Sequence, residues 1–300
     1  MSPLGHARSG VSLVFITANL AFWLLLAVPT RLVGGLLPGL AASAERWLRS
    51  FYLAAVRVDD FWLKRVIGLR WSMPDALALA PSSGSWIVLS NHVSWADVFL
   101  VQSLLLRHGL VIQFLTKREL LLLPVVGLVL WTFEFPLLRR SARRGESEAA
   151  RRRGDFEALR AACRRARERS VALVCFAEGT RATPARRAAR ASRYRHLLPP
   201  RAGGFGALCD GLGEALAGVV DCTLVYRGSS GTDRAATSAG HAANAISFWS
   251  FLAGDVGPIE VRSRCWPAAS IPLDRDERAR WLEARWAEKD EVITHRAAAR

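Results

Sequence analysis

Two short polar motifs, each directly after an apolar run, carry the residues of this chain that could do chemistry. The first is Asn91-His92-Val93-Ser94-Trp95-Ala96-Asp97, in which a histidine and an aspartate stand at H-x-x-x-x-D spacing. A near-neutral imidazole can take a proton from a hydroxyl, and a carboxylate on its other nitrogen fixes the tautomer and stabilises the protonated ring. His92 and Asp97 are therefore predicted to be a catalytic base and its support. We expect His92 to open a helix and Asp97 to lie one turn into it.

The second motif, Glu178-Gly179-Thr180-Arg181, supplies groups that suit an anion. Gly179 lets the backbone approach a ligand closely, and Thr180 offers a hydroxyl. Arg181 presents a bidentate fork that matches phosphate. Glu178 is expected either to hold Arg181 or to bind a substrate hydroxyl. Alone, His92 could be a structural turn histidine and Glu178–Arg181 a surface ion pair, but both motifs in this order favour a functional site.

The segments around these motifs alternate between short apolar runs and amphipathic stretches. The predicted strands are 85–90, 110–116, 171–176, 219–226 and 259–265, and the predicted helices are 95–107, 148–169 and 281–300. This alternation predicts an α/β domain with a largely parallel sheet flanked by helices. In such sheets ligands bind beyond the carboxyl ends of the strands, which is where both motifs fall. Segment 229–240 is rich in Ser, Gly, Thr and Ala and is predicted to be a loop.

The N-terminal region is a hydrophobic membrane segment by composition. Residues 11–28 carry no charge and are just long enough to cross a bilayer core, and apolar sequence continues past Pro29 and Arg31. One spanning helix and a shallow hairpin both fit, and a signal peptide cleaved near Ala42 is a third possibility. The excess of basic residues after the run predicts an inner (cytoplasmic) membrane protein whose catalytic domain faces the cytoplasm.

We expect three parts along the chain. Residues 1–44 form the membrane anchor or hairpin, residues 45–80 an amphipathic connector, and residues 81–300 the α/β domain. A second long apolar stretch, 120–138, is interrupted by Glu134. It is predicted to be embedded in a surface or buried, with a second spanning helix as the alternative.

Composition narrows the class of protein. The 300 residues carry a formal charge of +15, yet only three of the 41 basic residues are lysines. A basic surface suits anionic lipids, phosphorylated small molecules or nucleic acid. Nucleic-acid binding is the remote alternative, because stacking aromatic residues are sparse in the Arg-rich tracts 139–169 and 181–201. The five cysteines form no C-x-x-C pair, so neither a zinc site nor a disulfide framework is expected.

These motifs resemble those of the glycerophospholipid acyltransferase superfamily, the 1-acyl-glycerol-3-phosphate acyltransferases. Asn91–Asp97 resembles its first block, and Phe176–Arg181 its third. Residues 135–140, Phe-Pro-Leu-Leu-Arg-Arg, resemble its second block, and residues 198–204 resemble the segment after the third. One block departs from the pattern, because the apolar run 219–226 lacks the proline that many members carry there.

The resemblance implies a glycerol-3-phosphate acyltransferase-like fold and an acyl-transfer reaction. His92, supported by Asp97, would deprotonate the free hydroxyl of a lysophospholipid, which would attack the thioester of acyl-CoA or acyl carrier protein. Arg181 with Arg139 or Arg140 would bind the acceptor phosphate, and apolar surface in 120–138 would take the acyl chain. The implied partners are these two substrates and a membrane, with acyl carrier protein as a possible donor. Neither a metal nor a redox cofactor is implied, and no specific nucleic acid is expected.

Overall fold

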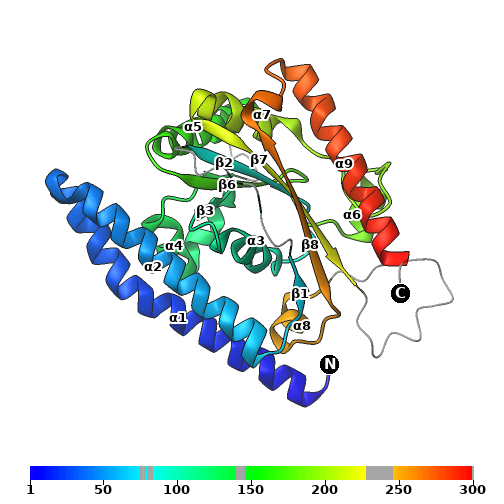
Figure 1. Cartoon of the computed structure of the whole chain (residues 1–300), viewed down its shortest axis with the longest axis horizontal. Helices are drawn as coiled ribbons and strands as arrows, with labels where there is room; N and C mark the ends of the chain where they lie inside the picture. The colour runs from blue at the N-terminus through cyan, green and yellow to red at the C-terminus, as the bar shows by residue number, and fades with distance from the viewer. Residues whose placement is uncertain (74–76, 78, 80–83, 140–145, 228–245, 299–300) are drawn as a thin grey trace.

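The computed structural model describes residues 1–73, 77, 79, 84–139, 146–227 and 246–298. Two of the predictions, the site role of Arg140 and the loop at 229–240, lie outside these residues. The described part contains a mixed sheet of six strands in the order β1-β8-β7-β2-β6-β3 (Figure 1). Its strands are β1 (Trp71–Ser72), β2 (Ser85–Ser90), β3 (Val111–Phe114), β6 (Val171–Phe176), β7 (Leu216–Tyr226) and β8 (Ile259–Pro267).

Strand β2 lies in the middle of the sheet and carries the first motif at its carboxyl end. All six of its residues are buried, as the apolar run 86–89 predicts for a strand covered on both faces. It runs parallel to β6 on one side and to β7 on the other. β3 is parallel to β6, β1 is parallel to β8, and the β7–β8 pair is antiparallel. The prediction of a largely parallel α/β sheet is confirmed.

Helices cover both faces of this sheet. One layer contains α5 (Glu148–Arg167), α7 (Ala202–Leu212) and α9 (Arg275–Ala298), and the other contains α3 (Asp97–Leu106) beneath the N-terminal helices (Figure 1). α9 begins six residues earlier than predicted because Asp274 caps it, accepting the N–H groups of Asp276 and Glu277 at 2.9 Å each. Two further helices are short: α6 (Pro184–Ala189) and α8 (Phe248–Ala253). Single turns lie at Gly213–Ala215 and Ala268–Ser270.

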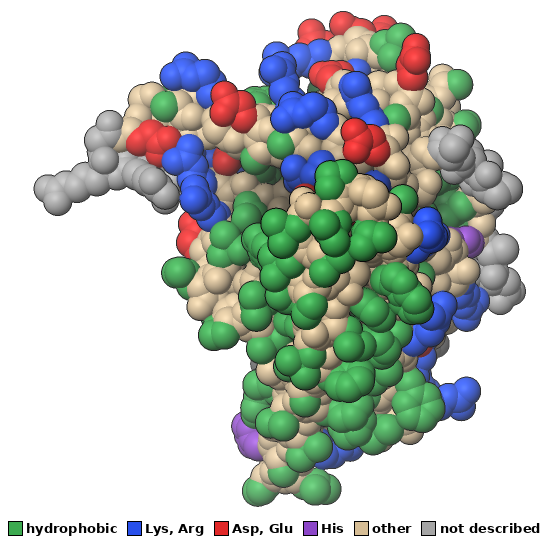
Figure 2. Space-filling view, turned by 90° about the vertical axis from the view of Figure 1, so that its left-hand side faces the viewer, with side chains coloured by type: hydrophobic (Ala, Val, Ile, Leu, Met, Phe, Trp, Pro, Cys, Tyr) green, Lys and Arg blue, Asp and Glu red, His purple; other side chains and the backbone are tan. Residues whose placement is uncertain are grey.

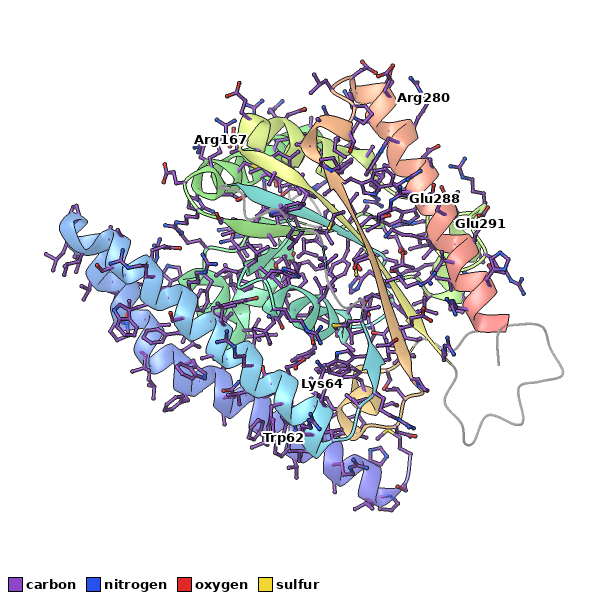
Figure 3. All side chains as sticks on the ribbon, in the orientation of Figure 1. Trp62, Lys64, Arg167, Arg280, Glu288 and Glu291 are labelled. Atoms are coloured by element: carbon purple, nitrogen blue, oxygen red, sulfur yellow. The ribbon has the colours of Figure 1, made fainter. Side chains whose placement is uncertain are left out.

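α9 shows how its sequence selects a buried face. Leu282, Trp286 and Lys289 follow one another at helical spacing and are buried against β7. Glu288 and Glu291 lie on the opposite, exposed side (Figure 3). One positive charge is therefore enclosed between this helix and the sheet.

The N-terminal segment is a helical hairpin. α1 (Pro3–Leu36) and α2 (Ala41–Phe61) are joined by a turn at Pro38–Leu40 and lie side by side along one edge of the molecule (Figure 1). A short π-helical turn, Trp62–Val66, ends α2. Residues 45–61 of the amphipathic connector predicted at 45–80 thus belong to the second helix of this hairpin. Gly34 permits close packing of the two helices, since a Cβ there would lie 2.6 Å from the Cβ of Ala44.

The second apolar stretch does not form a spanning helix. It divides into a turn at Arg118–Leu122, helix α4 (Pro124–Thr132) and strand β5 (Leu137–Leu138), which pairs with β4 (Thr116–Lys117). Nine helical residues reach only about 14 Å, about half of a bilayer core. The spanning alternative is therefore wrong, and the segment is a partly exposed surface element beside α1.

Glu134, which interrupts this stretch, joins the hairpin to the domain. Its carboxylate binds Arg31 of α1 at 2.5 Å and Arg169, just after α5, at 2.6 Å. Arg169 also lies 3.4 Å from Glu45 of α2. The charges that break the two apolar runs in the sequence therefore pair with one another in the fold.

Candidate active site

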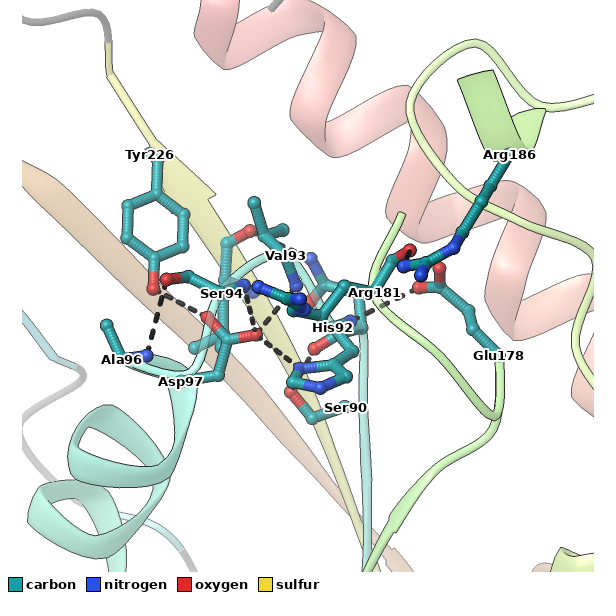
Figure 4. A network of polar contacts seen from close by, with 12 residues as sticks. Ser90, His92, Val93, Ser94, Ala96, Asp97, Glu178, Arg181, Arg186 and Tyr226 are labelled. Atoms are coloured by element: carbon teal, nitrogen blue, oxygen red, sulfur yellow. Dashed lines mark hydrogen bonds and ion pairs between the residues drawn. The ribbon is translucent and has the colours of Figure 1, made fainter. Parts of the chain in front are cut away.

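The first motif forms a tight loop between β2 and α3. β2 ends at Ser90, and Asp97 is the first residue of α3, so His92 lies in the loop and does not open the helix as expected. The loop turns the Asp97 carboxylate back toward it: Oδ2 lies 2.8 Å from Nδ1 of His92 and accepts the N–H groups of Val93 (2.6 Å) and Ser94 (3.0 Å) (Figure 4). Asp97 is fully buried. The predicted contact between His92 and Asp97 is present.

This contact determines which nitrogen of His92 can act as a base. The carboxylate can only accept, so Nδ1 carries the hydrogen and Nε2 is left to receive a proton. The ring also stacks on Phe176, the last residue of β6, with centroids 4.2 Å apart and planes at 19°. Stacking on one side and the Asp97 contact on the other hold the ring in one orientation. The Ser94 hydroxyl is buried and accepts the Ala96 N–H at 3.3 Å, which disfavours Ser94 as a nucleophile.

Glu178 does not hold Arg181. Its fully buried carboxylate accepts the backbone N–H of His92 through one oxygen and that of Leu198 through the other, each at 3.2 Å. Burial raises the pKa of Glu178 to about 8, against the opposing effect of these two donors. A further bond runs from the Ala182 N–H to the His92 carbonyl at 2.7 Å. Glu178 therefore ties the two motifs together through the backbone and is not exposed for a substrate hydroxyl.

The residues after Glu178 present a cation beside His92. Gly179 has a φ of +69°, in the left-handed region that glycine adopts without strain. The guanidinium of Arg181 lies 5.9 Å from the ring centroid of Trp95 and points toward the His92 loop (Figure 4). Within the described part of the chain no carboxylate forms an ion pair with Arg181. Gly179 and half-buried Thr180 stand between Glu178 and Arg181 in a loop whose two ends, Glu178 and Ala182, are hydrogen-bonded to the backbone of His92.

More arginines surround Gly179 than the sequence motif suggested. The Arg201 side chain lies over Gly179, where a Cβ would be 3.5 Å from its Cδ. Arg190 donates to the Glu178 carbonyl at 3.2 Å, and burial together with the nearby charges of Arg201 and Arg186 lowers its pKa. Such mutual repulsion is relieved by an anion. Positive charge therefore gathers on this side of His92.

Arg139, the described arginine of the second block, contacts Glu146 and helix α5. Arg139 pairs with Glu146 at 2.8 Å, and its backbone N–H donates to Asp155 of α5 at 2.8 Å. Arg151 of the same helix donates to the Arg139 carbonyl at 2.6 Å. Its described contacts therefore join it to α5, not to the His92 loop, and a role in acceptor binding stays a prediction for Arg139 and Arg140.

Three further residues join the site to β7: Asn91, which belongs to the first motif, and Tyr226 and Lys289, which were not foreseen. The Asn91 amide exchanges two hydrogen bonds with the backbone of Leu224 in β7, at 2.8 and 3.0 Å. Tyr226 donates to Oδ1 of Asp97 at 2.6 Å. Lys289 donates to the Cys222 carbonyl at 2.6 Å and pairs with Asp221 beneath the strand ends. The one sequence signal was at Lys289, a rare lysine in a chain that otherwise uses arginine.

Comparison with known proteins places the chain in a family. The Acyltransferase family matches residues 76–227, a range that holds both motifs, and the chain belongs to this family. An uncharacterized acyltransferase of Schizosaccharomyces pombe is 28% identical over 220 residues, 69% of this chain and 58% of that protein. The human 1-acyl-sn-glycerol-3-phosphate acyltransferase delta is 28% identical over 214 residues, 68% of this chain and 51% of its own length.

A solved structure shares the fold. The 1-acyl-sn-glycerophosphate (LPA) acyltransferase PlsC of Thermotoga maritima superposes with a TM-score of 0.50 over 97% of both chains, at 14% identity. This likeness supports the α/β architecture and the N-terminal helices as one fold. The chain spans about half the length of the curated relatives it matches.

Proposed function

We propose that this protein is a membrane-bound O-acyltransferase that moves a fatty acyl group from an acyl thioester to the free hydroxyl of a lysophospholipid. The observation that carries the proposal is the His92–Asp97 pair, joined by Glu178 to a loop that presents Arg181. 1-Acylglycerol-3-phosphate, giving phosphatidic acid, is the favoured acceptor because relatives carry that substrate in their names. Lysophosphatidylglycerol and lysocardiolipin are the alternative acceptors.

The geometry supports a direct transfer without a covalent enzyme intermediate. Nε2 of His92 takes the proton of the acceptor hydroxyl while its oxygen attacks the thioester carbonyl. Asp97 stabilises the protonated ring. The tetrahedral intermediate collapses, the C–S bond breaks, and the leaving thiolate receives the proton that His92 holds. The reaction yields one ester and one thiol, and none of its steps uses a metal or redox cofactor.

The acceptor phosphate fits the positive side of the site. The Arg181 guanidinium matches two phosphate oxygens, and the exposed Gly179 lets the backbone come near them. Arg201 adds charge over the same glycine. The acyl donor is a thioester of either coenzyme A or acyl carrier protein, and with both donors the leaving group is a thiol. Arg181→Ala should therefore raise the KM for a phosphorylated acceptor more than it changes the KM for the donor.

Membrane association rests on the inverted polarity of α1. Its polar side chains face the protein: Ser9 and Ser12 donate to carbonyls of the α8 segment at 2.7 and 2.9 Å, and Asn19 donates to Ala55 of α2 at 2.9 Å. Its outer face is apolar, with large exposed side chains at Leu4, Val11, Val14, Phe22, Leu25 and Leu36. A helix that borders water has the opposite arrangement. The outer face of α1 is thus suited to lipid.

We favour a hairpin that lies in the membrane interface over a helix that spans it. α1 is the described helix that is long and apolar enough to cross a bilayer, but it packs along α2, α4 and α8 of its own domain. The hydrophobic side chains on this side of the molecule gather into one surface (Figure 2). α4 extends it with exposed Leu128 and Trp131, and Leu122 and Leu123 precede them. Tryptophan is enriched at the membrane–water interface, and Trp131 is exposed on this surface.

The experiment is acyl transfer from labelled oleoyl-CoA by membranes that contain the full chain. Lysophosphatidic acid and a panel of other lysophospholipids are offered, with His92→Ala as the blank. Transfer to lysophosphatidic acid alone supports the favoured acceptor, and transfer to another lysolipid moves the substrate but keeps the chemistry. If neither CoA nor carrier-protein thioesters give transfer above the blank, the proposal fails.

A further inference from the structure

Tyr226, the last residue of β7, completes the set of donors around the Asp97 carboxylate. Oδ2 accepts from the His92 ring and from the N–H groups of Val93 and Ser94. Oδ1 accepts from the Tyr226 hydroxyl at 2.6 Å. Since Asp97 is fully buried, water does not share in this solvation. Tyr226 is thus the partner of the oxygen that the loop itself leaves free.

The position of Tyr226 follows from the length and register of β7. β7 pairs in parallel with β2, with Cys222 opposite Ser90, and continues four residues beyond the end of β2. Asn91 pairs with both backbone groups of Leu224, which requires a residue with an N–H at that position. β7 contains no proline, and the strand continues two residues beyond Leu224 to end at Tyr226.

We propose that Tyr226 is a positioning residue that fixes the Asp97 carboxylate and, through it, controls how readily His92 takes a proton; this rests on the proposed role of His92 as the general base. A hydrogen bond to Oδ1 orients the carboxylate and draws part of its charge away from Oδ2. The protonated ring of His92 is then stabilised less than it would be by a carboxylate without that donor.

The surroundings keep Tyr226 in the donating form. Burial, followed by the negative charge of Asp97, raises the pKa of the phenol well above its usual range. Besides Tyr226 and Asp97, the titratable or charged groups around them come from the neighbouring elements: His92 from the loop after β2, Glu178 and Arg181 from the loop after β6, Cys222 from β7, and Lys289 from α9. The test therefore compares variants that change the Tyr226 hydroxyl alone.

The first measurement is the pH dependence of acyl transfer by Tyr226→Phe, which keeps the ring and removes one hydroxyl. We expect kcat to fall about tenfold, as the loss of a hydrogen bond to a charged group predicts. The acid limb of the profile should move up by about one pH unit, because the less solvated Asp97 favours the protonated ring. KM for both substrates should stay within about twofold, since the hydroxyl that the variant lacks is bound to Asp97.

A second measurement does not depend on turnover. The His92 ring is titrated by NMR in the full chain, with its signals assigned by their loss in His92→Ala. The titration midpoint should move up in Tyr226→Phe by about the same single unit. Tyr194→Phe is the matched control, because the Tyr194 hydroxyl bonds Arg193 and the Glu283 carbonyl at another place, and it should change neither curve.

The outcomes separate the two proposals. A lower kcat with an unmoved acid limb and an unmoved midpoint would make Tyr226 merely structural and overturn the inference. A moved midpoint in a protein that transfers no acyl group would keep the Tyr226–Asp97–His92 coupling and reject the proposed function. Equal midpoints in the wild type and in Tyr226→Phe would reject the coupling whatever the activity.

Discussion

The Asp97 carboxylate shows how one buried residue organises a loop. It accepts four hydrogen bonds from the loop, the His92 ring and β7, and it sits at the N-terminus of α3, where a negative charge is favoured. The same carboxylate therefore shapes the backbone and orients the base. A substitution of Asp97 should therefore affect catalysis or the loop structure, depending on which of these hydrogen bonds it removes.

Asp97→Asn tests the chemical part. The amide can keep the bond from Tyr226 but presents either a donor or a neutral oxygen to Nδ1 of His92, so the ring loses its fixed tautomer and its counter-charge. We expect kcat to fall by about 10²–10⁴ with a smaller change in KM. Steady-state kinetics on purified protein measure this, with a melting curve to show that the fold is retained. A variant with wild-type kcat would contradict the role of Asp97.

Glu178 makes a prediction about stability and pH. Its pKa is raised from 4.5 to about 8 in the folded protein, so the folded state holds a proton that the unfolded state loses. This contribution to stability is complete below about pH 4.5 and is lost as the pH rises through about 8. The melting temperature should therefore fall between pH 6 and pH 9.

Glu178→Gln removes that titration. The variant should be less stable at pH 6, because its NH2 group cannot accept from one of the two backbone donors, at a cost of about 1–3 kcal/mol. Its melting temperature should also depend less on pH than that of the wild type. Parallel pH curves for the two proteins would show that Glu178 does not titrate in this range.

At the scale of the elements, the sequence was most informative where burial is complete. Strands 85–90 and 171–176 lie where they were predicted, because a strand covered on both faces contains an unbroken apolar run, here 86–89 and 171–176. The antiparallel partner β8 and the early start of α9 depend on pairing and capping that the apolar pattern does not contain. The bond of Tyr226 to Asp97 spans 129 residues, and neither residue type nor spacing indicates it.

The helix α9 also stabilises the strand ends that carry the site. Lys289 is almost fully buried, and it binds Asp221 and the carbonyl of Cys222 in β7. Lys289→Met leaves the Asp221 charge buried without a partner, which should lower the free energy of unfolding by about 3–5 kcal/mol. Chemical denaturation measures the change.

The double variant Lys289→Met with Asp221→Asn is the control for that prediction. It removes the second charge, so it should recover part of the lost stability. If the double variant is less stable by the sum of the two single effects, the pair does not interact, and Lys289 acts only through its carbonyl contacts.

At the scale of the whole molecule, the fold places one continuous apolar surface on the side of the sheet that α3 covers. α1, α2 and α4 form this surface, and α3 lies between it and the sheet while carrying Asp97 at its first residue. A lysolipid that remains in the bilayer could then reach the site without leaving the lipid phase. This route exists only if the outer face of α1 binds lipid and does not simply support the fold.

Val14→Asp with Leu25→Asp tests this requirement, because both side chains are about 70% exposed and pack little against the domain. Each apolar side chain withdrawn from lipid should cost about 1.5–3 kcal/mol, so the two together should lower vesicle binding by about 100-fold or more. Flotation with vesicles measures binding, and transfer to a short-chain, water-soluble lysolipid measures the intact site. The control is Arg152→Asp with Arg153→Asp, on the exposed side of α5. It changes the net charge of the protein more than the α1 variant does. If the α1 variant floats like the wild type, or loses short-chain activity together with binding, the hairpin is part of the folded core and the membrane contact lies elsewhere.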